Sequence, residues 1–227
     1  MDNAEVLKVL SSKGATKFFH SNSALTSITF LEAGALLSRQ YVEKNGLKQT
    51  SQPSDAIDKR YGIWNDVFFD TVDIHDWARR KNHYGPVLFV LNTTSVLTDN
   101  SLKSTLRIAR ENPTGWKDGQ KDNERYFQTV DEFAKAFSFG DFGKHFMFKT
   151  NNGTIALAAH IDHILLDDPK DALGDKSVFD TASKALMAAA KRGKVNVEIR
   201  RRECRQGCRC LENYKAAQAA QKAMFAA

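Results

Sequence analysis

The pattern of apolar and polar positions predicts short strands that alternate with helices. Residues 17–20 (KFFH) favour a short buried strand, and residues 86–91 (PVLFVL) predict a buried central strand. Residues 195–202 (VNVEIRRR) alternate as a strand does. Between two further apolar runs, Asn152 and Gly153 form a dipeptide typical of a hairpin turn.

Helices are predicted between these strands. From Ser23 to Gly34, apolar residues recur at helical spacing, with Ser23 suited to an N-cap and Gly34 to a left-handed C-terminal cap. Residues 130–137 (VDEFAKAF) predict a short amphipathic helix after a Thr129 cap. High helix propensity extends the same expectation to residues 181–190 and 216–227, and residues 1–10 suggest a short helix.

Two polar stretches predict irregular structure. Residues 40–60 combine glycine, proline and small polar residues, and residues 95–123 suggest a surface loop. No internal repeat and no linker is visible. The chain therefore predicts one α+β domain over residues 1–227.

Composition places the chain among globular proteins. Of its 227 residues, 42% are hydrophobic and 26% are charged. The apolar runs are far shorter than the roughly 18 residues of a membrane span, so no membrane association is expected. The first residues lack the features of a secretory signal, which predicts a cytoplasmic protein with reduced thiols.

The formal net charge of +6 is concentrated in one segment. Residues 191–210 hold eight Lys and Arg against two Glu, a net charge of +6 that accounts for the whole excess. Such a segment favours nucleic acid as partner, with contacts expected from Arg200, Arg201, Arg202 and Arg205. The alternative is a solvated basic face without a partner.

All three cysteines, Cys204, Cys208 and Cys210, lie in the same segment. Their spacing allows three thiolates to bind zinc or an iron–sulfur centre, with a histidine or an external ligand completing the shell. Neighbouring arginines would also favour redox-reactive thiolates, and a chance cluster is the third alternative. His160, Asp162 and His163 offer a weaker metal motif, because a strand there would place the histidines on opposite faces, and we assign no metal to it.

Common catalytic fingerprints are absent: the sequence has no Walker A loop, Rossmann glycine triplet, nucleophile elbow or HExxH motif. Polar residues at the ends of predicted elements remain as candidates, chiefly His20, Arg39 and Glu198. The phenylalanines of residues 137–148 are expected to belong to the core.

Three segments resemble the DarT-like nucleic-acid ADP-ribosyltransferases. FFHSNSALTSITFLEAGALLSR (residues 18–39) is similar to the opening of that family, a strand ending in His, a helix and a Gly-Leu-Leu turn, here one residue longer. NHYGPVLFVLN (residues 82–92) resembles the segment in which His and Tyr precede an apolar strand. VNVEIRRR (residues 195–202) looks like the late strand with the catalytic glutamate. The resemblance covers about the first ninety residues and this late segment, and the middle of the chain departs from it.

The resemblance implies an ADP-ribosyltransferase fold, with split antiparallel sheets, flanking helices and NAD bound as substrate between the sheets. Glu198 would then be the catalytic carboxylate, stabilising positive charge on the ribose and positioning the acceptor. For the family's arginine, Arg39 is the first choice, with Arg60, Arg79 and Arg80 open. His20 would donate to a ribose hydroxyl; the remaining cofactor residues would be Asn22 and Tyr84.

The leading hypothesis is thus an NAD-dependent transferase that modifies DNA or RNA, single-stranded or with an extruded base. The resemblance implies a toxin or phage-defence effector with an antitoxin partner. A protein-directed ADP-ribosyltransferase is one alternative. Another is a non-enzymatic nucleic-acid-binding module with a structural Cys-metal site.

Overall fold

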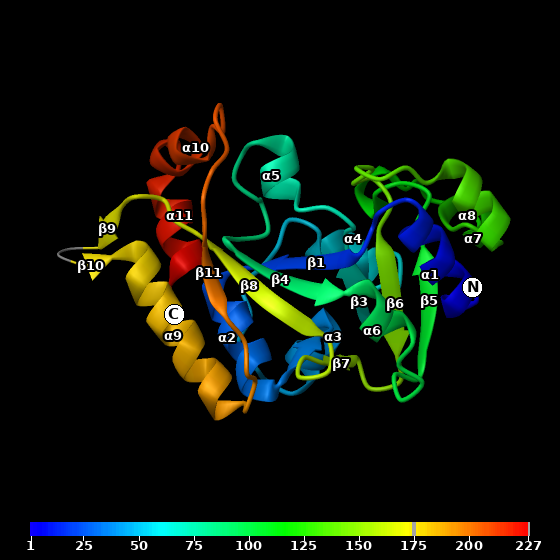
Figure 1. Ribbon diagram of the computed structural model, residues 1–227, viewed down its shortest axis with the longest axis horizontal. Helices are drawn as coiled ribbons and strands as arrows, with labels where there is room; N and C mark the ends of the chain where they lie inside the picture. The colour runs from blue at the N-terminus through cyan, green and yellow to red at the C-terminus, as the bar shows by residue number, and fades with distance from the viewer. Residues whose placement is uncertain (174–175, 227) are drawn as a thin grey trace.

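Two β-sheets meet along one strand edge at the centre of the molecule (Figure 1). The computed structural model describes residues 1–173 and 176–226. The four-stranded sheet has the order β1 (Lys17–Asn22), β4 (Val87–Asn92), β8 (Ile161–Asp167), β11 (Ile199–Arg202). The three-stranded sheet has the order β3 (Asp66–Phe69), β6 (Phe146–Thr150), β5 (Ser104–Ile108).

Strand pairing in both sheets is antiparallel, with one exception. The central strand β4 pairs with β1 on one side and β8 on the other, and all its apolar residues are buried, which confirms the prediction for residues 86–91. β11 runs parallel to β8, because the chain crosses through helix α9 (Val178–Arg192) before it re-enters the sheet. The expected α+β fold with split sheets is confirmed, and its late strand joins at the far edge.

A backbone bridge and a cluster of aromatic rings join the two sheets. The Phe19 amide donates to the Asp70 carbonyl at 2.9 Å, and the Asp70 amide donates back at 3.0 Å. Beside this bridge, the Phe18 ring packs 5.2 Å from the rings of both Phe69 and Phe146. The two sheets therefore share one hydrophobic core.

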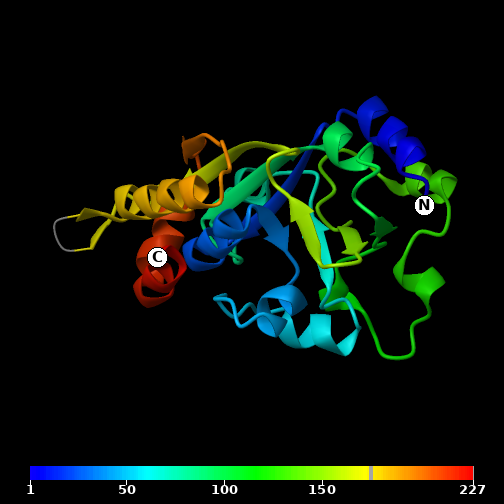
Figure 2. The same ribbon diagram turned by 90° about the horizontal axis from the view of Figure 1, so that it is seen from below.

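Helices cover both ends of this core. α2 (Ala24–Ala33) begins and ends as predicted: Ser23 accepts the Thr26 amide, and Gly34 adopts a left-handed φ of 68°. α2 packs against α9 and α11 (Gln218–Phe225) at the end that holds the C-terminus, whereas α1 (Asn3–Ser12) and α8 (Val130–Ala136) lie at the opposite end (Figures 1 and 2). The other helical segments are α3 (Arg39–Lys44), α4 (Asp55–Arg60), α5 (Ile74–Ala78), α6 (Thr93–Leu97), the 3₁₀ turn Pro113–Gly115, α7 (Asp122–Arg125) and α10 (Cys210–Ala216).

Several local predictions were wrong because pairing partners come from distant segments. The Asn152-Gly153 turn does not close a hairpin: β6 pairs with β3 and β5, while β7 (Thr154–Ala156) pairs with β2 (Ala35–Leu37). Within the expected loop at residues 95–123, β5 forms an edge strand. The excursion at residues 40–60 contains α3 and α4, and only the last four residues of 195–202 are strand.

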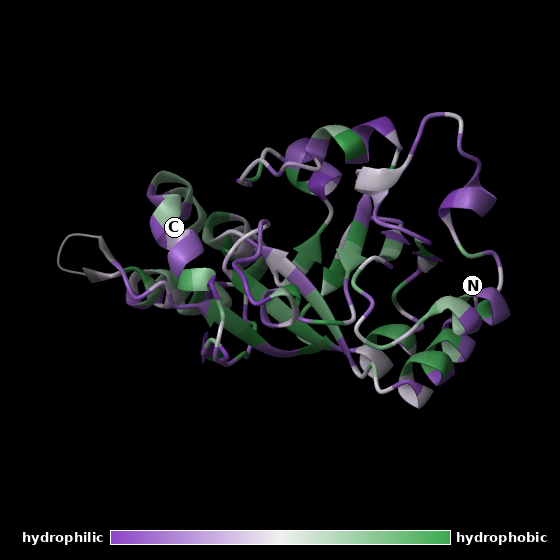
Figure 3. Ribbon diagram, turned by 90° about the horizontal axis from the view of Figure 1, so that it is seen from above, coloured by the Kyte–Doolittle hydropathy of each residue, from purple (hydrophilic) through white to green (hydrophobic). Residues whose placement is uncertain are grey.

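The distribution of hydropathy follows this arrangement. Apolar residues concentrate on the strands of the sheets, while the outer loops are largely hydrophilic (Figure 3). Near the sheet edge, two more short strands, β9 (Ala172–Leu173) and β10 (Lys176–Ser177), pair before α9. Within the described parts of the chain, no helix has the length and apolar character to cross a membrane.

Gly85 fixes how closely the end of β1 approaches the start of β4. Its φ is 143°, and a Cβ at this position would lie only 2.2 Å from the Asn22 carbonyl oxygen. The backbone can pass so close to Asn22 because glycine has no side chain.

We expect Gly85→Ala to lower the free energy of unfolding by about 2 kcal/mol or more, because the added methyl group must displace backbone. Chemical denaturation measures this change. The control is Gly62→Ala, since Gly62 also has a positive φ of 67° but no atom within 4 Å of an added Cβ. Equal losses in the two variants would show that the close approach at Asn22 is unimportant.

Candidate active site

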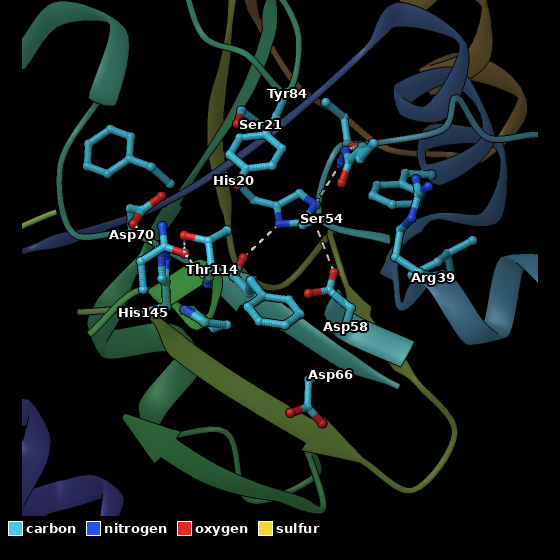
Figure 4. Close-up of a pocket in the computed structure, with 18 residues that line it drawn as sticks. His20, Ser21, Arg39, Ser54, Asp58, Asp66, Asp70, Tyr84, Thr114 and His145 are labelled. Carbon is cyan, nitrogen blue, oxygen red and sulfur yellow. Dashed lines mark hydrogen bonds and ion pairs between the residues drawn. The ribbon is translucent and has the colours of Figure 1, made fainter. Parts of the chain in front are cut away.

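A pocket opens where β1 and β3 separate beyond the Phe19–Asp70 bridge (Figure 4). The structure brings into it all four side chains expected near the cofactor or its phosphates: His20, Asn22, Arg39 and Tyr84. The rest of the lining comes from the same two strands, α2, β2, α4 and loops, namely Phe19, Ser21, Phe30, Leu37, Gln52, Ser54, Asp58, Asp66, Phe68, Asp70, Asn112, Pro113, Thr114 and His145. Segments from the first half of the chain thus build most of the pocket.

His20 and Asn22 project from the same face of β1 and form one hydrogen-bonded chain. His20 Nδ1 donates to the Phe68 carbonyl at 2.7 Å, so its Nε2 accepts from Asn22 Nδ2, also at 2.7 Å. Asn22 Oδ1 in turn accepts from Gln52 at 2.9 Å. Burial lowers the pKa of His20, which keeps the ring neutral at pH 7.

This chain changes the role expected for His20. Both ring nitrogens are engaged within the protein, so His20 has no N–H to donate to a ribose hydroxyl. The ring instead fixes the orientation of the Asn22 amide at the pocket wall.

Arg39 is held rigidly at the pocket wall. It begins α3 after the Ser38 N-cap, and its side chain is buried. The guanidinium donates to both carboxylate oxygens of Asp55, at 2.8 and 2.7 Å, and to the Thr50 carbonyl at 3.0 Å. Its Nε is buried and has no hydrogen-bond partner among the described residues. A fixed guanidinium group whose Nε–H has no partner among the described residues therefore borders the pocket.

Three carboxylates line the pocket, and their partners differ. Asp66 pairs with Arg107, and Asp70 lies 3.0 Å from His145 Nδ1. Asp58 makes no ion pair within the described residues and accepts a hydrogen bond from Ser54 at 3.3 Å. In Figure 4, Asp58 lies beside Ser54, whereas Asp70 and His145 lie together on one side. Among the three pocket carboxylates, Asp58 is thus the one that pairs with no basic side chain of the described residues.

The pocket shifts the pKa values of its acids and bases. Burial raises the pKa of Asp58 to about 6, and the neighbouring charge of Asp55 adds to this effect. For His145, burial favours the neutral ring, but the charges of Asp70 and Asp58 outweigh it and raise the pKa. Burial also raises the pKa of Tyr84, which keeps its hydroxyl protonated.

Glu198 does not lie in this pocket. It is an exposed residue immediately before β11, and its carboxylate pairs with Arg200 at 2.7 Å, which lowers its pKa. β11 and β1 are the opposite edges of the four-stranded sheet, about 14 Å apart at three strand spacings. Glu198, expected as the catalytic carboxylate, therefore lies at the far edge of the sheet and outside the pocket that holds His20.

The arginines of the basic segment are occupied by acidic partners. Arg200 pairs with Glu198, Arg201 with Asp168, and Arg205 with Asp76. Arg202 is buried, because its position in β11 points it inward, where it pairs with Asp167 and Asp73. The expectation that Arg202 contacts nucleic acid is therefore corrected, while Arg200 and Arg205 remain on the surface.

Cys204, Cys208 and Cys210 converge on a residue that the sequence did not reveal, His75 of α5. The histidine precedes the first cysteine by 129 residues, so no local spacing links them. His160 and His163 are engaged separately, the first with Asp99 at 3.1 Å and the second with Asp162 at 3.2 Å. Asp58 was also missed, because one acid in a polar stretch carries no recognisable signal.

The fold of the chain is similar to that of solved structures. No protein-family model matches the chain, and no curated protein sequence matches it. Among solved structures, the chain is similar to DarT of Thermus sp. 2.9 in complex with ADP-ribosylated ssDNA, with a TM-score of 0.53 and 11% identity over 83% of this chain and 95% of that chain. Structures of that DarT with NAD+ and with carba-NAD+ give TM-scores of 0.47 and 0.48, at 13% and 12% identity, each over 82% of this chain and 95% of that chain.

The chain therefore has the fold of the DarT ADP-ribosyltransferases. This result confirms the fold that the resemblance implies. The pocket lies where the two sheets separate.

The raised pKa of Asp58 predicts a pH-dependent difference in stability. An acid whose pKa rises from 3.8 to about 6 on folding binds its proton more tightly when folded, so its contribution to stability is lost as pH rises through this range. We expect Asp58→Asn to be more stable than the wild type at pH 7.5, by up to about 3 kcal/mol, with little difference near pH 3.5. Urea denaturation at both pH values measures this. A difference independent of pH would contradict the raised pKa.

Proposed function

We propose that this protein is an NAD-dependent ADP-ribosyltransferase that modifies single-stranded nucleic acid. The observation that carries the proposal is the pocket at the sheet separation of a DarT fold, which unites Asn22, Arg39, Asp58 and Tyr84. These side chains provide an oriented amide, a fixed cation, a carboxylate and an aromatic ring. Each matches a need of NAD or of the bond to be broken.

Arg39 and Asn22 are proposed to hold the NAD substrate. The guanidinium is held by Asp55, and its buried Nε–H, a donor without a partner among the described residues, is available to a pyrophosphate oxygen. The Asn22 amide is held by His20 and Gln52, so it can present polar atoms to a ribose without reorganising. Tyr84 offers an aromatic face for the nicotinamide ring.

Asp58 is proposed to take the carboxylate role expected of Glu198. Cleavage of the nicotinamide–ribose bond places positive charge on the ribose, and an adjacent carboxylate stabilises that charge. Because its pKa is about 6, Asp58 is mostly ionised at pH 7 yet basic enough to accept a proton from the acceptor nucleophile. Asp66 and Asp70 serve this role less well, since Arg107 pairs with Asp66 and His145 Nδ1 holds the Asp70 carboxylate at 3.0 Å.

Exposed aromatic side chains on segments that adjoin pocket residues in the sequence support a nucleic-acid acceptor. Trp77 and Phe139 are about half exposed, and Trp77 packs on the backbone at Gly140 next to Phe139. The phenylalanines of residues 137–148 were expected in the core, but two of them, Phe139 and Phe142, lie on the surface. α5, which carries Trp77, begins four residues after Asp70, and the loop with Phe139 leads into His145. Unpaired bases stack on such rings, and the cited DarT structure holds ADP-ribosylated ssDNA.

The biological role follows from this chemistry as part of the proposal. A bulky ADP-ribose on DNA or RNA would obstruct copying and translation, which suits a toxin or a defence effector acting in the cytoplasm. Cells that produce such an enzyme need an inhibitor, so an antitoxin partner is expected.

Incubation with labelled NAD and single-stranded DNA or RNA oligonucleotides tests the activity. We expect label on the oligonucleotide with release of nicotinamide, and a rate that rises with pH through about 6 as Asp58 ionises. Asp58→Asn should lower the rate by about 100-fold or more, the usual contribution of a general base.

Glu198→Gln serves as the matched acidic control and should retain activity, because Glu198 is exposed and outside the pocket. Loss of activity in this variant alone would return the catalytic role to Glu198. Labelling of protein but not of oligonucleotides would identify a protein-directed enzyme. If neither labelling nor nicotinamide release is detected, the proposed enzyme activity is wrong. If the protein still binds oligonucleotides in that case, it is a nucleic-acid-binding module.

Removal of the exposed ring of Trp77 tests the proposed stacking surface. Trp77→Ala should weaken binding of single-stranded oligonucleotides by about tenfold, since stacking on one aromatic ring contributes about 1–3 kcal/mol per base. Fluorescence anisotropy measures the change, and the KM for NAD should stay unchanged. The control is Met187→Ala, another half-exposed apolar residue, which lies on α9. Equal binding by both variants would exclude Trp77 from the surface.

A further inference from the structure

Four side chains with metal-binding atoms converge outside the candidate active site. The Nε2 or Nδ1 atoms of His75 and the Sγ atoms of Cys204, Cys208 and Cys210 supply ligand atoms that all lie within 4.8 Å of one another. His75 Nε2 is 3.5 Å from Cys208 Sγ and 3.9 Å from Cys204 Sγ. In a tetrahedral zinc site, bonds of about 2.0 Å to nitrogen and 2.3 Å to sulfur place neighbouring ligands about 3.5–3.8 Å apart. The cluster therefore has the dimensions of such a site.

The orientation of His75 is that of a metal ligand. The ring is buried, and its Nδ1 lies 2.9 Å from the Asp167 carboxylate, so that Nε2 faces the three thiols. Asp167 is held in turn by the Tyr214 hydroxyl at 2.6 Å and by an ion pair with Arg202. Carboxylate-bound histidines of this kind are the usual arrangement behind zinc, because the carboxylate fixes the ring and makes the free nitrogen a better donor.

The cysteine segment is also folded as a ligand-bearing turn. Gly207 has a φ of 78°, the Cys208 amide bonds back to the Arg205 carbonyl at 3.0 Å, and the Cys210 amide donates to Cys208 Sγ at 3.4 Å. A disulfide would use only two of the three thiols and would leave His75 Nε2 without a role. Three sulfurs and one imidazole are a soft donor set, which favours zinc over magnesium or calcium.

We propose that His75, Cys204, Cys208 and Cys210 bind one zinc ion in a four-ligand structural site. The site connects α5 to the segment that follows β11. Two other contacts already link these parts: the Arg205–Asp76 ion pair, and a backbone hydrogen bond from the Arg209 amide to the Arg79 carbonyl. α5 has only five residues, so its stability depends on tertiary contacts of this kind. Zinc with three thiolates and a neutral imidazole would carry one net negative charge, and Arg202 and Arg205 lie beside the cluster, where each also pairs with aspartate. This inference is independent of the proposed transferase activity.

Metal content of the purified full chain tests the proposal. We expect about one zinc per chain by elemental analysis, and on replacement by Co²⁺ the intense visible bands of a tetrahedral site with thiolate charge-transfer bands in the near ultraviolet. Cys208→Ser and His75→Ala should lose the metal, whereas His83→Ala, a change to an exposed histidine outside the cluster, should retain it. The wild-type Co²⁺ spectrum does not depend on whether the ligand variants fold.

Asp167→Asn tests the positioning role of the carboxylate. A chelator competition should show zinc affinity about ten- to a hundredfold weaker, with the same four-ligand Co²⁺ spectrum. The proposal is overturned if the wild type, prepared with zinc present and under reducing conditions, contains no metal and gives no tetrahedral Co²⁺ spectrum. A disulfide between two of the cysteines in that metal-free protein would overturn it equally.

Discussion

The junction between the two sheets is the contact on which the rest of the structure depends. The paired backbone hydrogen bonds of Phe19 and Asp70 join β1 to the end of β3, and Phe18 packs there against Phe69 and Phe146. Backbone groups buried in this core have to pair with each other, since water cannot reach them. Beyond this junction the strands separate, and the separation forms the pocket. One contact therefore both unites the core and creates the candidate active site.

Polar side chains of the pocket are fixed before any ligand binds. Asn22 is held between His20 and Gln52, and Arg39 is held by Asp55, so their orientations are set by the folded protein. Groups that need no reorganisation stabilise developing charge more effectively than mobile ones. Burial also destabilises ionised side chains in the pocket, as the raised pKa of Asp58 shows. The same desolvation that destabilises ionised Asp58 makes it suited to accept a proton near neutral pH.

The basic segment, residues 191–210, has a structural role in the folded protein. Its charge looked like a uniform surface for an anionic partner, but Arg202 is buried against Asp167 and Asp73. Asp167 connects this arginine to Tyr214 and to His75 of the thiol cluster. A buried charge of this kind is tolerated only when it is paired. Part of the positive charge of residues 191–210 is therefore neutralised inside the protein, where the ion pairs hold β11, α5 and α10 together.

Sequence alone determined the features that depend on local interactions: the α2 caps at Ser23 and Gly34, the buried strand at residues 86–91, and the α+β class. Residues 18–39 also contain His20, Asn22 and Arg39, which the fold brings to one pocket. These residues come together because β1, α2 and the start of α3 follow one another closely along the chain. Only the tertiary structure decided which distant segments pair. It placed Glu198 on the far sheet edge, brought Asp58 into the pocket, and set His75 beside cysteines 129 residues away. Local periodicity records which face of an element is apolar, but strand order and loop closure depend on packing across the whole core, which no single segment encodes.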